Sequence, residues 1–139
     1  MRAGIYPNPD LAYAGTVRQL EAIGRTQRSA VTALRDELQT IIGESFETRR
    51  SPQGAAWAPL KRPRPNGRIL HRTGRLRREA TRGRIEGTST VTFTFPGYGG
   101  LHQLGASRLP ARPFLPMPTL GRGVEQRLAS VLVRAWFRL

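Results

Sequence analysis

The chain has 139 residues, 23 basic and nine acidic side chains, a formal net charge of +14 and no cysteine. This length suits a single domain spanning residues 1–139 with one modest core. Without cysteine there are no disulfides, thiolate metal sites or thiol nucleophiles. Since no stretch is apolar over the length of a membrane span, we expect a soluble cytosolic protein that does not engage a membrane.

The first predicted element is helical and covers residues 16–48. Apolar residues recur there at steps of three and four, most regularly from Val31 to Phe46, which indicates an amphipathic helix or a helix pair. Glycine costs roughly 1 kcal/mol relative to alanine inside a helix, so we expect a break at Gly24 rather than one continuous helix. Pro52 ends the pattern, because the residue before a proline is kept away from helical angles.

A basic, proline-rich loop is predicted at about residues 51–72, and a loop of this length in a small domain is usually functional or disordered. The block 49–84 around it holds 12 of the 23 basic residues and one acid, Glu79. Such a block either faces a polyanion or consists of solvated surface arginines. The arginines predicted to face DNA are Arg62, Arg64, Arg68, Arg72, Arg75, Arg77 and Arg78.

A small antiparallel sheet and a C-terminal helix are predicted after this block. Residues 91–95 alternate apolar side chains with threonine, which is the clearest strand signal in the chain, and residues 85–89 predict a strand and a turn before it. Residues 97–100 are expected to form a flexible turn, and residues 106–118 an extended arm. The last helix is expected at about 119–138. The predicted fold class is therefore α+β with long extended loops.

The sequence offers few groups for catalysis or metal binding. Its histidines are His71 and His102, and its aspartates are Asp10 and Asp36. No serine lies in a nucleophile-elbow motif, and two separate histidines lack the ligand spacing of a metal site. We therefore expect no enzymatic activity, no metal and no cofactor.

Two segments place large apolar residues among glycines, prolines and arginines. The first segment contains Gly-Ala-Ala-Trp-Ala-Pro-Leu at 54–60 and Ile-Leu-His-Arg-Thr-Gly-Arg-Leu at 69–76. The second segment contains His-Gln-Leu-Gly at 102–105 and Pro-Ala-Arg-Pro-Phe-Leu at 110–115. Prolines keep such segments extended and prevent the regular hydrogen-bond ladder of a β-sheet. Both effects favour docking of the segments on another molecule. The predicted interface residues are Trp57, Leu60, Leu70, Leu76, His102, Gly105, Arg112, Pro113, Phe114 and Leu115.

These residues differ in whether we expect them to pack against their own domain or against another molecule. Packing against its own domain is favoured for Trp57, whereas an intermolecular contact is slightly favoured for Phe114 and Leu115. The planar guanidinium of Arg112 suits bidentate contact with a carboxylate or with backbone carbonyls, and we expect it to anchor an interface. A Phe114→Ala variant is accordingly expected to stay folded and to assemble less well.

In their order along the chain these segments resemble the phage virion morphogenesis family, the small tail-completion or neck proteins of Mu-like and related tailed phages. The likeness covers roughly residues 27–135, and the closing "H-Q-x-G … P-A-R-P-F-L" element is its most specific part. The resemblance implies that His102 and Gly105 shape a turn. It also implies an α+β structural subunit without catalysis or cofactor.

The resemblance further implies a place in the virion. The subunit would assemble in the host cytoplasm into a homo-oligomeric ring, expected to be a hexamer, at the head-proximal end of the tail. Its partners would be connector or head-completion proteins and tail terminator or tail tube proteins. Genomic DNA would pass through the ring.

The alternative is a non-specific nucleic-acid-binding protein that uses the segment 49–84. Phosphate contacts by arginine need little order and make binding sensitive to salt. Against this alternative, the sequence contains no basic recognition helix, and the segment holds only Trp57 as a stacking aromatic. Both functions are compatible if the arginines of a ring face the DNA.

Overall fold

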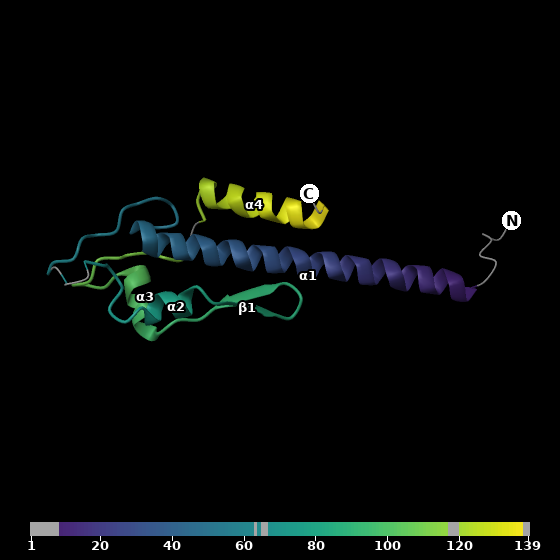
Figure 1. Cartoon of the computed structure of the whole chain (residues 1–139), viewed down its shortest axis with the longest axis horizontal. Coiled ribbons are helices and arrows are strands. Elements are labelled where there is room, and N and C mark those ends of the chain that lie inside the picture. Colours follow the sequence, from purple (N-terminus) through teal and green to yellow (C-terminus); the bar gives the residue numbers. More distant parts are fainter. Residues whose placement is uncertain (1–8, 63, 65–66, 117–119, 138–139) are drawn as a thin grey trace.

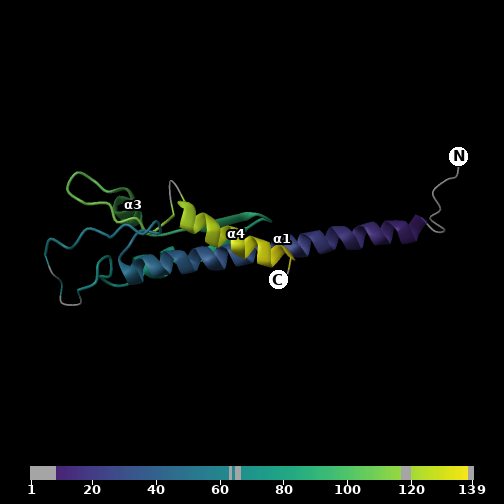
Figure 2. The same cartoon turned by 90° about the horizontal axis from the view of Figure 1, so that it is seen from above.

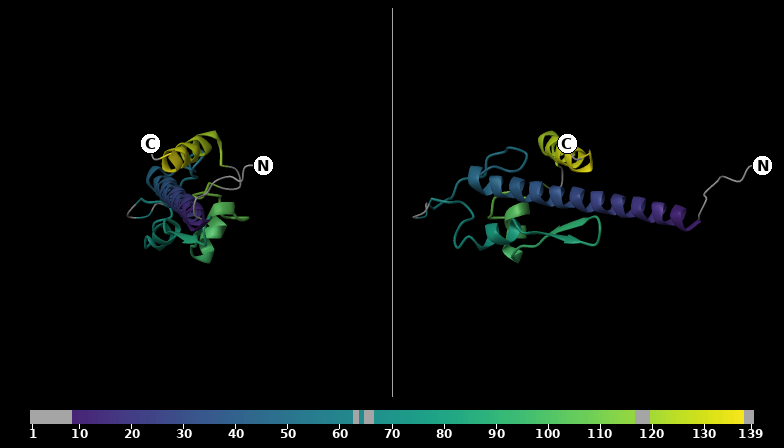
Figure 3. Two further views of the ribbon diagram at one scale, coloured as in Figure 1. Left: turned by 90° about the vertical axis from the view of Figure 1, so that its right-hand side faces the viewer. Right: turned by 45° about the vertical axis from the view of Figure 1, so that its right-hand side comes forward.

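The computed structural model describes residues 9–62, 64, 67–116 and 120–137, and the chain is built along one long helix (Figure 1). The elements are α1 (Pro9–Thr48), α2 (Arg75–Ala80), β1 (Gly83–Glu86), β2 (Thr90–Phe93), α3 (Gly97–Leu104) and α4 (Arg122–Phe137). α4 lies on one side of α1, and α2, α3 and the sheet lie on the other (Figure 1, Figure 3). This arrangement confirms the predicted α+β class. Within the described residues, no helix has both the length and the apolar character needed to cross a membrane.

α1 is one continuous helix of 40 residues, so the predicted break at Gly24 is wrong. At about 1.5 Å per residue, a helix of this length extends roughly 60 Å. Gly24 lies in open space, and its cost of about 1 kcal/mol is smaller than the cost of stopping and renucleating a cooperative hydrogen-bond ladder. After α1, Arg49 has a left-handed φ of 56°, and the chain turns away before Pro52.

α4 runs antiparallel to α1 along one side of it (Figure 1). Three buried residues and three partly buried leucines form this contact: Ile41, Val124 and Leu128, with Leu34, Leu38 and Leu120. Arg127 ties the two helices together, because its Nε lies 2.6 Å from Glu37 Oε1 and its Nη1 lies 2.5 Å from Glu44 Oε2. The predicted C-terminal helix is confirmed, beginning at Arg122; the predicted start near residue 119 lies outside the described residues.

β1 and β2 form a two-stranded antiparallel sheet in which Gly83 pairs with Phe93, which confirms both predicted strands and the turn between them. The second strand ends at Phe93 rather than at residue 95. Gly83 lies so close to α1 that a Cβ there would stand 2.7 Å from Arg35 Cγ. Its amide donates to Gln39 Oε1 at 2.8 Å. Glycine at this position therefore lets the sheet pack directly on α1.

The main core forms where both irregular segments return to the C-terminal half of α1. The rings of Phe46 and Trp57 meet edge to face, with centroids 5.6 Å apart, and Phe95 meets Phe114 in the same way at 5.3 Å. Trp57 Nε1 donates to the carbonyl of Pro113 at 2.7 Å. Other buried members are Ile42, Ile69, Leu76 and Ala80. The aromatic residues of the two loop segments thus complete the core of their own chain.

This packing corrects much of the predicted interface. Four of its residues are buried within the chain: Trp57, Leu76, Arg112 and Phe114. Three more are partly buried against the same core: Leu60, Leu70 and Leu115. The prediction for Trp57 in its own domain is confirmed, and the intermolecular role predicted for Phe114 is wrong. Prolines keep residues 110–115 extended as expected, but the extended backbone finds its hydrogen-bond partners inside the same chain.

We predict that Phe114→Ala lowers the free energy of unfolding by about 3–5 kcal/mol, because the change removes a fully buried ring and leaves a cavity. Urea denaturation followed by tryptophan fluorescence measures this loss. Leu104→Ala is the matched control: Leu104 is 80% exposed, and its loss should stay within about 0.5 kcal/mol. Equal, small losses in both variants would contradict the described core.

Candidate binding cavity

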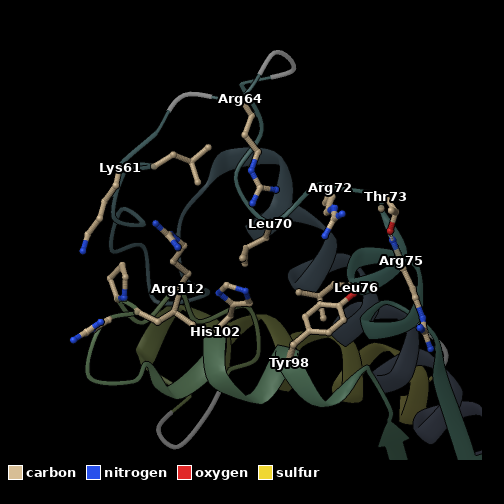
Figure 4. Close-up of a pocket in the computed structure, with 15 residues that line it drawn as sticks. Lys61, Arg64, Leu70, Arg72, Thr73, Arg75, Leu76, Tyr98, His102 and Arg112 are labelled. Atoms are coloured by element: carbon tan, nitrogen blue, oxygen red, sulfur yellow. Dashed lines mark hydrogen bonds between the residues drawn. The ribbon is translucent and has the colours of Figure 1, made fainter.

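A cavity of about 680 Å³ opens where the proline-rich loop, α3 and the arm meet (Figure 4). Its cationic lining residues are Lys61, Arg64, Arg72, Arg75, Arg108 and Arg112. Its apolar lining residues are Leu60, Leu70, Leu76, Tyr98, Leu109 and Pro110. No aspartate or glutamate is among the described residues of the lining. The cavity therefore combines an apolar floor with an excess of positive charge.

α3 supplies the floor of the cavity, in place of the flexible turn predicted at residues 97–100. A Cβ on Gly99 would lie 2.6 Å from Phe95 Cδ2 and 2.7 Å from Leu76 Cδ1, so only glycine allows α3 to approach α2 this closely. Tyr98 and His102 are four residues apart and share one face of the helix. Both side chains consequently line the same cavity.

Gly105 ends α3 with a left-handed φ of 79°. The chain then reverses, and Ala106 N donates to Leu109 O at 2.8 Å. As the arm returns beside α3, the amide of Arg112 donates to His102 O at 2.6 Å. Gly105 therefore shapes a turn, as expected, whereas His102 lies within α3 and contacts the returning arm through its carbonyl.

Arg112 links the arm to the proline-rich loop. Its Nε donates to Ala58 O at 2.9 Å, and its Nη2 donates to Pro59 O at 3.0 Å. The predicted bidentate contact with backbone carbonyls is thus confirmed, but it joins two segments of one chain instead of two molecules. Burial lowers the pKa of the guanidinium, since no carboxylate among the described residues pairs with this charge.

Gln103 has a role that the sequence interpretation missed. Its Oε1 accepts hydrogen bonds from the amides of Phe114 and Leu115, both at 3.0 Å, and its Nε2 donates to Leu115 O at 3.2 Å. One side chain therefore satisfies the backbone of the arm in place of a β-ladder. The sequence feature that could have indicated this role is the position of Gln103 inside the "H-Q-x-G" element, which precedes the arm.

His102 lies at the centre of the cavity lining (Figure 4). Its Nδ1 is buried and has no hydrogen-bond partner among the described residues. Burial lowers the pKa of the imidazole, and the charges of Arg112 and Arg64 lower it further. The neutral form is consequently favoured in the folded protein.

The arginines predicted to face DNA separate into three groups. Arg64, Arg72 and Arg75 line the cavity, and Arg75 Nε also lies 2.6 Å from Glu79 Oε1. Arg62, Arg68 and Arg78 are exposed outside it. Arg77 is only partly exposed and forms an ion pair with Glu47, which already balances its charge within the chain; its assignment to a DNA-facing surface stays a prediction.

The remaining cations of the cavity have no counter-charge within the described part of the chain. Lys61, Arg64, Arg72 and Arg108 form no ion pair there. Lys61, Arg108 and Tyr98 were not predicted as site residues, because only the fold brings the arm and α3 beside the loop. No group of three or more potential ligands for a metal ion occurs among the described residues.

Comparison of the chain with protein-family models, with curated proteins and with solved structures gives no match. The resemblance to virion morphogenesis proteins accordingly stays a prediction that rests on the motif residues. In the folded chain the motif segments contact one another. Arg112 of the last motif holds the carbonyls of Ala58 and Pro59 in the first, and Gln103 holds the arm.

We predict that the free energy of unfolding falls as the pH is lowered from about 7.5 to 5, in part through His102. Because the pKa of His102 is lower in the folded chain, the unfolded chain binds the extra proton first. The contribution of His102 is therefore complete above the unfolded pKa of about 6.5 and is lost below it. Urea denaturation at each pH should give a smaller fall for His102→Gln than for the original chain; equal falls would contradict this role.

Proposed function

We propose that this protein is a structural virion subunit of the tail-completion or neck type. In this proposal it assembles with copies of itself into a ring at the head-proximal end of a phage tail, within the host cytoplasm. It then joins connector or head-completion proteins to the tail terminator or tail tube. The motif residues suggest the class of protein, and the exposed apolar faces of two helices support self-association.

The observation that carries the proposal is the bare N-terminal half of α1. This half extends well beyond the other elements (Figure 1, Figure 2). Among the side chains described from residue 19 on, the first buried ones are Ala30 and Val31, whereas Leu20 and Ile23 are 63% and 56% exposed. Helices in proteins gain most of their stability from packing an apolar face. An uncovered helix with spaced apolar residues therefore favours a partner surface.

α4 offers a second uncovered apolar surface. Val124 and Leu128 are buried against α1, but the C-terminal end of the helix leaves four large apolar residues exposed: Leu132, Val133, Trp136 and Phe137. Clustered exposed apolar residues are typical of interaction sites. A contact between the bare half of α1 in one copy and α4 of the next joins two different surfaces. Contacts of this head-to-tail kind generate a ring when the rotation closes.

Non-specific nucleic-acid binding is the second candidate function. Arg62, Arg68 and Arg78 are exposed on the loop and α2, outside the cavity. Such side chains suit phosphate contacts, which release counterions and weaken as salt rises. This candidate is compatible with the first, because a ring around a genome would present arginines to DNA without reading its sequence.

We predict that the double variant Leu20→Asp, Ile23→Asp abolishes self-association, because it places charges on the bare face of α1. Sedimentation velocity over a concentration series measures the oligomer. Gln19→Asp, Ala22→Asp is the matched control: it adds the same charge one helical position away, on exposed residues of the same segment, and should still assemble. Circular dichroism should report the same helix content in both variants.

A chain that stays monomeric at every concentration would contradict assembly without further partners. Equal loss of assembly in both double variants would instead trace the effect to added charge and would remove the assigned contact face. Mass spectrometry of purified virions addresses the location independently, since the proposal requires the protein to be present in the finished particle.

A further inference from the structure

We infer that the cavity between the proline-rich loop, α3 and the arm binds an acidic peptide segment of a protein partner, with one bulky apolar side chain on its floor and carboxylates at its cationic rim. This inference goes beyond the self-association proposed above. It uses a different surface, on the opposite side of α1 from α4 (Figure 1).

The first support is the shape and lining of the cavity. Its volume of about 680 Å³ lies within the range of about 300–1,000 Å³ that is usual for ligand sites. Leu70, Leu76 and Tyr98 form an apolar centre, with the side chain of Leu70 directed into the cavity (Figure 4). Covering these side chains with a further apolar group would be favourable, because it would remove their apolar surface from water.

The second support is the backbone of Leu70. Its φ of 57° is left-handed, which is uncommon for a residue with a large side chain and costs free energy. Strained residues of this kind concentrate at binding and switch sites. In this conformation the side chain of Leu70 is directed into the cavity, below Arg64 and beside Arg72 (Figure 4).

The third support is electrostatic. Lys61, Arg64, Arg72 and Arg108 have no carboxylate partner in the described chain, and the buried cation of Arg112 has none either. Like charges gathered around a recess of low polarity repel one another and attract an anionic ligand. Carboxylates suit arginine in particular, because its planar fork binds them through two hydrogen bonds.

The arrangement favours an acidic peptide over nucleic acid. Lys61 lies on one side of the cavity and Arg72 and Arg75 lie on the other, with Arg64 above the middle and Leu70 between the two sides (Figure 4). A peptide with a central apolar residue and flanking carboxylates matches this order. Nucleic acid would place phosphates at the rim, but the leucines of the floor suit an apolar side chain better than a base, and Tyr98 and His102 are the only aromatic rings of the described lining on which a base could stack.

The test is fluorescence anisotropy with a fluorescein-labelled peptide that carries two aspartates on each side of a Leu-Phe pair. One control peptide has asparagine for aspartate, and another has alanine for Leu-Phe. We expect binding of the first peptide and at least about tenfold weaker binding of both controls, which corresponds to about 1.4 kcal/mol. A labelled single-stranded DNA of equal charge is measured in parallel.

Matched variants locate the site. Arg72→Glu reverses an exposed charge at the rim and should weaken peptide binding at least tenfold, whereas Arg84→Glu reverses an exposed charge on β1, outside the cavity, and should leave it unchanged. Tyr98→Ala, at a residue 45% exposed, should weaken binding of the aspartate peptide while unfolding in urea stays close to that of the original chain.

Several results would overturn the inference. They are no binding of the aspartate peptide at about 1 mM, equal binding of all three peptides, or equal loss in the Arg72 and Arg84 variants. Binding of DNA that depends on Arg72, without binding of the peptide, would assign the cavity to nucleic acid instead. Loss of ring assembly in the α1 variants has no bearing on these outcomes, so the two proposals fail separately.

Discussion

The packing of Trp57 and Phe114 against Phe46 is the interaction on which the rest of the structure depends. α1 alone offers a stripe of apolar residues with nothing to cover it, and the small sheet is too short to do so. The two irregular segments supply the missing aromatic rings, and the bond from Trp57 Nε1 to the carbonyl of Pro113 joins them to each other. Segments rich in proline are thereby fixed without forming a ladder of their own.

The geometry of the cavity follows from this constraint. With Trp57 and Phe114 buried, the loop and the arm pass beside α3, and arginines and leucines of both segments line the cavity. Arg112 bridges the two segments through the carbonyls of Ala58 and Pro59. The core is then complete on the side of α1 that carries α2, α3 and the sheet. The surfaces left for partners are the cavity itself and the bare faces of α1 and α4.

Local patterns predicted the C-terminal half of α1, the sheet and α4, because the spacing of apolar residues from Val31 to Phe46 reports on burial and the alternation at 91–95 is typical of a strand. They missed α3, whose glycine-rich start at residues 97–100 indicated a turn. They failed where the outcome depends on distant residues. The continuity of α1 through Gly24 depends on the cooperativity of the whole helix. Phe114 can dock on its own chain only if α1 leaves room for its ring. A local sequence pattern around Phe114 contains no information about that space. The cavity likewise exists only after folding.

Hydrogen exchange of the purified protein, at a concentration at which it is monomeric and read by mass spectrometry, tests the central claim most directly. The amides of Trp57, Arg112, Phe114 and Leu115 donate to partners within the same chain. We expect peptides that cover them to exchange slowly, like the C-terminal half of α1, while the bare half of α1 exchanges faster. Rapid exchange across residues 55–60 and 110–115 in the free chain would contradict the account, because it would mean that these segments become ordered only on another molecule.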